Sequence, residues 1–273
     1  MSDLILLAMD GSPAARLAAR AAIQIARERN LLVLGLYVVD EAFISDPQSD
    51  IQAELSTNQV PMTKAELLSR FVLQGEQSLQ WLEKSCHEAD VISSTNILFG
   101  GVTETIVKEA DCATMVALGR RGHSHASNKD HLGLNFRSIA MHTQKPLLVG
   151  GDDLRPIKKV LAALRGGDQS QDTLEWSARL HQSLDFELTI LAVNEAKPDR
   201  AVERMLVKQS GVQKYQFLYR SGKPADEIVS AAADSQSDLI IMGHYRQSTL
   251  DEWLTGSIPD QVLRQTHVPV IIV

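Results

Sequence analysis

The chain has 273 residues, 44% hydrophobic and 22% charged, which is ordinary for a globular protein. Its net charge of −7 without a basic block disfavours nucleic-acid binding as the main function, because such a surface repels a phosphate backbone. With no signal peptide, no apolar stretch of the roughly 18 residues that a membrane span needs and no disulfide framework, we expect a cytoplasmic protein without membrane contact.

In chain order, short apolar strands alternate with helices. The first strand is expected over residues 4–9, and Ser12 and Pro13 then open a helix over about 13–29. Thr63 and Glu66 form a capping-box pattern that opens a helix extending through Leu82. The other elements expected in this part are strands at 31–39, 96–99, 114–118 and 147–149, and helices at 102–110 and 136–142.

The second part of the chain shows the same alternation. Strands are expected at 158–164, 187–193, 213–219, 238–242 and 270–273, and helices at 170–184, 199–209, 224–234 and 257–266. Strands that alternate with helices predict parallel sheets with right-handed crossovers. The predicted fold class is therefore α/β, with two tandem doubly wound five-stranded parallel-sheet domains of the Rossmann-like, nucleotide-binding type, at 1–151 and 152–273.

Spacing between glycines and prolines indicates an internal repeat. Gly133 precedes Pro146 by the same interval as Gly256 precedes Pro269, and the two glycines lie 123 positions apart. The offset is 155 at the first strand of each copy but only 122 near the third, so the first copy carries about 33 extra residues. We place them in or around the polar stretch 40–62, where a mobile flap is expected.

A ligand of such a sheet binds beyond the carboxyl ends of the strands, at the switch point, which is the place where the order of the strands reverses direction. Asp10, Gly11 and Ser12 follow the first strand, and Gly119 follows the fourth. The fourth strand leads into Gly119-x2-Gly122-x10-Gly133 in the first copy. In the second copy, it leads into Gly243-x2-Arg246-x9-Gly256-Ser257. Glycines let backbone amides approach phosphate oxygens, and a helix N-terminus supplies free N–H groups.

This pattern resembles the universal stress protein family, whose nucleotide-binding members carry Gly-x2-Gly-x9-Gly-Ser/Thr after the fourth strand. The resemblance covers nearly the whole chain, twice, and it implies a stress-response binding or signalling protein. It also implies that ATP or AMP is a possible ligand, with the acidic residue after the first strand directed toward ribose and adenine.

Family members commonly dimerise through their last strands. Here the strands at 147–149 and 270–273 can pair antiparallel within one chain, as an internal pseudo-dimer, and a further homodimer is possible.

The two copies depart from the family pattern at different positions. The first copy has Leu134 in place of the phosphate-binding hydroxyl, but it keeps the acidic residue, so it is the better candidate for an adenine nucleotide. Its candidate binding residues are Asp10, Gly11, Ser12, Val39, Gly119, Gly122 and Gly133.

The second copy is a degenerate candidate site. Arg165 replaces the acidic residue and Arg246 replaces the second glycine. The two arginines can bind a different small anion, or they can fill the cleft by pairing with Asp251 or Glu252. The candidate residues of this copy are Arg165, Gly243, Arg246, Gly256 and Ser257.

Neither catalysis nor a metal site is expected. The sequence has no GxSxG, no HExxH and no Walker lysine, so no catalytic residue is assigned. His123, His125 and His131 could be arranged around zinc, but they form no recognised ligand signature, so solvent-exposed side chains are expected instead. Two alternatives remain open: a stress protein that binds no nucleotide and acts through unidentified protein partners, and a weak ATPase.

Overall fold

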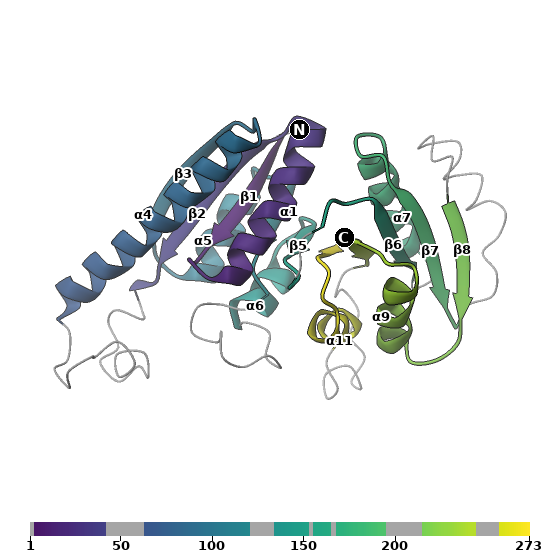
Figure 1. The fold of residues 1–273 in the computed structure, drawn as a ribbon. Coiled ribbons are helices and arrows are strands. Elements are labelled where there is room, and N and C mark those ends of the chain that lie inside the picture. Colours follow the sequence, from purple (N-terminus) through teal and green to yellow (C-terminus); the bar gives the residue numbers. More distant parts are fainter. Residues whose placement is uncertain are drawn as a thin grey trace.

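The computed structural model describes residues 3–41, 63–120, 134–152, 155–164, 168–194, 215–243 and 257–273. The part of the chain up to β5, here called the first half, contains an α/β alternation (Figure 1). Its elements are β1 (Leu4–Met9), α1 (Pro13–Arg29), β2 (Leu32–Val39), α4 (Lys64–Glu88), β3 (Ser93–Phe99), α5 (Val102–Ala110), β4 (Met115–Leu118), α6 (Leu134–His142) and β5 (Leu147–Val149).

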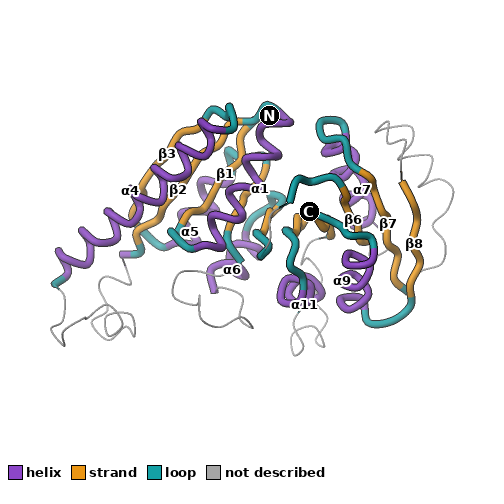
Figure 2. Tube along the Cα trace, viewed as in Figure 1, coloured by secondary structure: helices purple, strands orange, loops and turns teal. Residues whose placement is uncertain are grey.

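The part from β6 onward, here called the second half, repeats this alternation (Figure 2). Its described elements are β6 (Lys159–Leu164), α7 (Asp168–His181), β7 (Glu187–Val193), β8 (Tyr215–Arg220), α9 (Pro224–Asp234), β9 (Leu239–Met242), α11 (Ile258–Gln265) and β10 (Val270–Ile272). The helix expected at 199–209 lies outside the described residues.

All the described strands form one ten-stranded sheet in the order β3-β2-β1-β4-β5-β10-β9-β6-β7-β8. Within each half the strands are parallel, and the order reverses direction at the first strand of that half. The predicted fold class is therefore confirmed. Apart from the edge strands β3 and β8, the strands are apolar along most of their length because helices cover both faces of the sheet.

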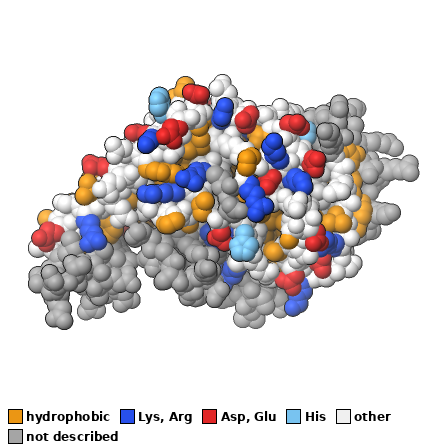
Figure 3. All heavy atoms as spheres, viewed as in Figure 1, with side chains coloured by type: hydrophobic (Ala, Val, Ile, Leu, Met, Phe, Trp, Pro, Cys, Tyr) orange, Lys and Arg blue, Asp and Glu red, His pale blue; other side chains and the backbone are white. Residues whose placement is uncertain are grey.

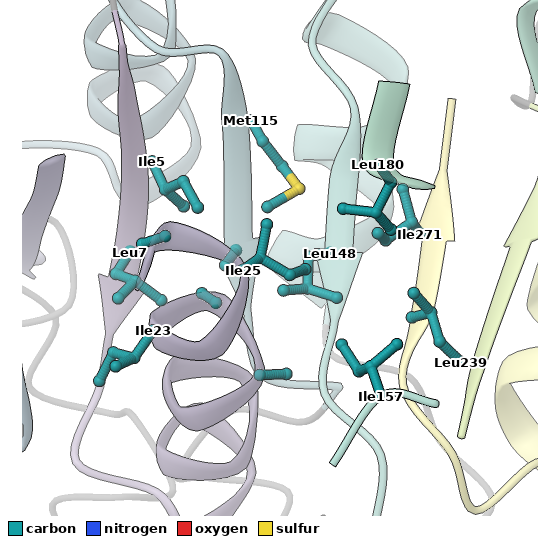
Figure 4. Close-up of a cluster of buried hydrophobic side chains, with 14 of the residues drawn as sticks. Ile5, Leu7, Ile23, Ile25, Met115, Leu148, Ile157, Leu180, Leu239 and Ile271 are labelled. Atoms are coloured by element: carbon teal, nitrogen blue, oxygen red, sulfur yellow. The ribbon is translucent and has the colours of Figure 1, made fainter. Parts of the chain in front are cut away.

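The halves are joined by antiparallel pairing of β5 with β10, as the sequence predicted. Leu148 pairs with Ile271, and both side chains are fully buried. Figure 4 shows Leu148 and Ile271 among apolar side chains from both halves, including Ile25 of α1 and Leu180 of α7. The pairing uses two strand edges that a separate half would leave exposed, which removes a template for aggregation.

Two apolar clusters lie on the two faces of the sheet, and each continues through both halves. One contains side chains of α1, α4 and α7, such as Ile25, Leu82 and Leu180. The other contains side chains of α5, α6, α9 and α11, such as Phe136 and Val262. The hydrophobic core is thus shared by the halves, and most of its stabilisation comes from removing this apolar surface from water.

Helix caps explain where the first helices begin. The Ser12 hydroxyl accepts a hydrogen bond from Ala15 N–H at 3.1 Å, and Pro13 occupies the first turn of α1. α4 begins with the predicted capping box: Thr63 Oγ1 accepts from Glu66 N–H at 3.3 Å, and Glu66 Oε2 accepts from Thr63 N–H at 2.8 Å. These bonds satisfy N–H groups that have no partner within the helix.

Arginine–tryptophan contacts tie α1 to both of its neighbours on one face. Arg16 and Arg20 place their guanidinium carbons 5.2 and 5.9 Å from the ring centre of Trp81 on α4. Arg29 lies 5.9 Å from the Trp176 ring on α7, so it links the halves. Burial and the nearby charge of Arg179 lower the pKa of Arg29. In Figure 3, Lys and Arg side chains lie over α1 and at the junction of the halves, among Asp and Glu side chains.

Several predicted boundaries were wrong by a few residues. β3 begins at Ser93 instead of residue 96, because the polar residues before Asn96 pair with β2 from Val33 onward. α4 extends through Leu82, as expected, and ends at Glu88. The expected flap falls mainly in 42–62, outside the described residues.

No helix in the described part of the chain has the length and apolar character to cross a bilayer.

Candidate functional site

The carboxyl ends of β1 and β4 meet at one edge of the sheet. The two strands are adjacent, with Ala8 paired to Leu118. Asp10 and Gly119, which follow these strands, are therefore neighbouring loop positions, as the sequence predicted. In the second half β6 and β9 are adjacent in the same way, with Ala163 paired to Met242. The topology thus creates two equivalent switch points, at which sheets of this class bind ligands.

The loop after β1 is a compact turn. Ser12 N–H donates a hydrogen bond to Asp10 Oδ1 at 2.9 Å. The bond uses only this one of the two carboxylate oxygens of Asp10. Gly11 has a φ of +81°, a conformation that L side chains rarely adopt, so glycine is required at this position. Ser12 is buried and caps α1, so its hydroxyl oxygen contributes to the helix start.

Gln74 of α4 also contacts this turn, and the sequence analysis missed it. Gln74 Nε2 donates to the Asp10 backbone carbonyl at 3.0 Å. A Cβ atom on Gly11 would lie 3.0 Å from the same nitrogen, so the side chain and the turn fit closely. The sequence offered one weak signal, a polar residue beside Gly75 on the inner face of the helix.

Tyr37 of β2 lies beside the same turn. Its position in β2 pairs with Met9 of β1, and its ring packs so closely on α4 that a Cβ on Gly75 would lie 2.7 Å from it. Burial, followed by the negative charge of Asp10, raises the pKa of the Tyr37 hydroxyl to about 12. Tyr37 therefore stays protonated and neutral beside the carboxylate at neutral pH.

Val39, predicted as a binding residue, has its side chain in the core. It is 1% exposed, and its carbonyl accepts a hydrogen bond from Gly100 N–H at 3.1 Å. This bond ties the end of β2 to the end of β3. The Val39 side chain therefore belongs to the core at the end of β2.

Gly119 permits close packing between the end of β4 and the start of α1. A Cβ atom here would lie 2.7 Å from the backbone nitrogen of Ala15 and 3.0 Å from the carbonyl carbon of Ala14. Backbone atoms cannot move aside as a flexible side chain can, so glycine is needed. The predicted residues Gly122 and Gly133, and the histidines His123, His125 and His131, lie outside the described residues.

Arg120, the residue after Gly119, is a second feature that the sequence analysis missed. Its side chain is 3% exposed, and Nη1 donates to the Thr266 carbonyl at 2.8 Å. The same nitrogen lies 3.7 Å from Asp152 Oδ2. A residue of the first switch point is thus bound by the turn between α11 and β10 in the second half. No sequence pattern indicated this contact, because its partner is a backbone carbonyl 146 positions away.

Two of the predicted residues of the second half are described. Gly243 follows β9, and Ser257 is the N-cap of α11, where its hydroxyl accepts from Asp260 N–H at 3.3 Å. Arg165, Arg246 and Gly256, together with the carboxylates Asp251 and Glu252, lie outside the described residues. Among the residues that the structure describes, no group of three His, Cys, Asp or Glu side chains could hold a metal ion.

Comparison with known proteins gives consistent results. The model of the Universal stress protein family matches residues 1–149 and again 199–273. The universal stress protein Slr1230 of Synechocystis is 30% identical over 162 residues, which span 58% of this chain and 56% of that relative. The universal stress protein YxiE of Bacillus subtilis is 28% identical over 145 residues, covering 42% of this chain and 97% of YxiE.

Solved structures match the whole fold. A universal stress protein of Archaeoglobus fulgidus superposes with a TM-score of 0.77 at 19% identity, over 100% of this chain and 98% of the other. A functionally unknown protein of Pseudomonas aeruginosa superposes with a TM-score of 0.67 at 14% identity, over 100% and 92%. At these identities the structural matches establish the fold alone.

Proposed function

The chain belongs to the universal stress protein family, and on this premise we propose that its first half binds an adenine nucleotide beyond the ends of β1 and β4. The observation that supports the proposal best is the placement of Asp10 and Gly119 at adjacent strand ends. Such a switch point is where ligands of doubly wound sheets bind. We propose a binding or signalling role in the stress response instead of catalysis.

The geometry of the β1 loop suits this role. One Asp10 oxygen accepts the Ser12 N–H, which holds the carboxylate in place, and we propose that the other oxygen accepts a ligand hydroxyl. Gln74 fixes the backbone of the same loop from α4. Gly119 keeps the β4 end against the first turn of α1, where a side chain would force the two segments apart. The site is therefore preorganised by contacts on both sides.

Isothermal titration of the full chain with ATP and with AMP tests the proposal. We expect Asp10→Asn to keep the loop hydrogen bond but to weaken binding by roughly tenfold, because the ligand loses a charge-assisted hydrogen bond. Asp111→Asn, an exposed acid at the end of α5, is the matched control and should bind like the wild type. Absence of heat with both nucleotides in the wild type would refute the proposal and favour a protein that acts through partners alone.

The weak-ATPase alternative has its own readout. Phosphate release by the wild type well above that of the Asp10→Asn variant would assign hydrolysis to this cleft and contradict a purely binding role.

A crystal soaked in nucleotide tests the proposed difference between the halves. We expect ligand density at the first switch point, whereas density only at the second would reverse the assignment.

A further inference from the structure

Two arginines of the first half bind α11 of the second half or the turn that follows it. Arg120, next to Gly119, donates to the Thr266 carbonyl at the end of α11. Arg137, in α6, lies with Nη2 3.0 Å from Asp260 Oδ2 in the first turn of α11. In the sequence, Arg120 and Arg137 flank the connection from β4 to α6. Both sides of that connection are therefore bound to the same helix or its terminal turn.

Arg137 and Asp260 occupy equivalent positions in the two halves. Arg137 is the fourth residue after Gly133, and Asp260 is the fourth after Gly256. Leu148 and Ile271, which pair at the centre of the junction, are separated by the same interval of 123 positions as the two glycines. A residue on a two-fold axis meets its own equivalent. In a dimer of two first halves, Arg137 would thus face a second Arg137.

The charge of Arg137 suits the opposite half better than its own helix. α6 begins at Leu134, so Arg137 lies near the positive N-terminal end of the helix dipole, where a cation is unfavourable. Asp260 lies at the N-terminal end of α11, where an anion is favourable. The Asp260 side chain is 7% exposed and that of Arg137 is 45% exposed, so the buried carboxylate relies on a cation that reaches it from the surface.

We propose that the second half is a dedicated partner that positions the ligand site of the first half through α11. α11 holds Gly119 in place through Arg120 and holds α6 through Arg137. The β5–α6 surface accepts a half that carries Asp260 and rejects a second copy of the first half. The effect on ligand affinity rests on the proposed nucleotide site, whereas the effect on the Gly119 turn does not.

Hydrogen exchange on the full chain without ligand tests the positioning directly. Asp260→Asn removes the charge in the second half and keeps the shape of the side chain. We expect faster amide exchange in the first half, at residues 118–120 and 134–142, compared with the wild type. Asp185→Asn, an exposed acid elsewhere in the second half, is the control and should leave these segments unchanged. Faster exchange confined to α11 would overturn the proposal.

Charge reversal tests whether Arg137 and Asp260 act as a pair. Arg137→Asp and Asp260→Arg should each lower the midpoint of thermal unfolding, and the double variant should recover much of the loss. Additive losses in the double variant would show that the two charges do not act on each other, against the proposal.

ATP titration of the wild type and the Asp260→Asn variant measures how strongly α11 affects the proposed nucleotide site. We expect Asp260→Asn to weaken binding about fivefold or more, although the residue lies in the other half. If the amide hydrogens of the first half exchange faster in the variant but its ATP affinity is unchanged, the proposal that α11 affects the ligand site is refuted. If the wild type binds no nucleotide, the proposed function fails, while the hydrogen-exchange result still decides whether α11 positions the Gly119 turn.

Discussion

Leu148 of β5 and Ile271 of β10 pair with each other at the centre of the ten-stranded sheet, although they lie in different halves of the chain. Both belong to one apolar cluster that runs through the two halves. The junction is thus continuous with the core, and the stability of one half depends on the other.

Leu148→Ala should reduce the stability of the whole chain. The side chain is fully buried, so truncation leaves a cavity and should cost about 3 kcal/mol. Urea unfolding followed by both fluorescence and circular dichroism measures this cost, and we expect one shared transition. Ile92→Ala, at a side chain that is 73% exposed, is the control and should have little effect. Separate transitions for the halves would contradict a shared core.

Gly119→Ala should destabilise the chain by about 1–3 kcal/mol, because the added methyl group would overlap backbone atoms of Ala14 and Ala15. Nucleotide binding should weaken in parallel as the β4 end moves away from α1. Gly101→Ala is a matched control, since its Cβ would first meet the flexible Glu104 side chain at 3.5 Å. Thermal unfolding and ATP titration of both variants provide the comparison. Equal behaviour of the two would argue against a tight contact at Gly119.

Tyr37→Phe should change how stability depends on alkaline pH. The pKa of Tyr37 is raised from 10.0 to about 12 in the folded chain, so folding favours the protonated hydroxyl. This contribution is fully present below pH 10, the ordinary pKa, and it is lost as the pH rises toward about 12. We expect the variant to lose stability less steeply across this interval. Urea unfolding at several alkaline pH values measures the slope, with Tyr215→Phe as the control. An unchanged slope would show that Tyr37 does not titrate in this way.

Thr63→Ala should loosen the start of α4. Hydrogen bonds from the Thr63 backbone and then its side chain lower the pKa of Glu66. A lowered pKa in the folded state means that the bond stabilises the fold above the unfolded pKa and is lost as the pH falls through the folded value. The variant should therefore exchange amides faster than the wild type over residues 64–70 at neutral pH, and the difference should shrink in acid. A difference that grows in acid would contradict this account of the capping box.

The sequence was sufficient to predict the fold because the signals that specify each helix and strand come from residues close together in the chain. Apolar runs such as Leu4–Met9, the cap formed by Ser12 and the capping box at Thr63 each specify an element from neighbouring residues. The alternation of strands and helices then indicated the topology, and with it the adjacent placement of Asp10 and Gly119. Boundaries were less accurate where tertiary pairing decides them, as at the polar start of β3.

The site was only partly predictable for the same reason. Its glycines and Asp10 belong to a pattern with fixed spacing. The side chains that hold them do not, because Gln74, Tyr37 and Arg120 reach the site from other elements. No periodicity in the sequence marks a contact such as that between Gln74 and the Asp10 carbonyl, 64 positions away.

By itself, the sequence determined that the chain is a tandem repeat of one α/β unit and that the copies have lost different parts of one glycine pattern. It also predicted that the last strands of the two copies can pair, whereas only the tertiary structure decided which side chains of the neighbouring helices and loops meet across that junction. Pairing of β5 with β10 brings Arg137 against Asp260, and the approach of α11 brings Thr266 to Arg120. Local patterning sets the elements, but which distant surfaces pack together depends on how the folded halves fit, and that fit links the candidate site to the second half.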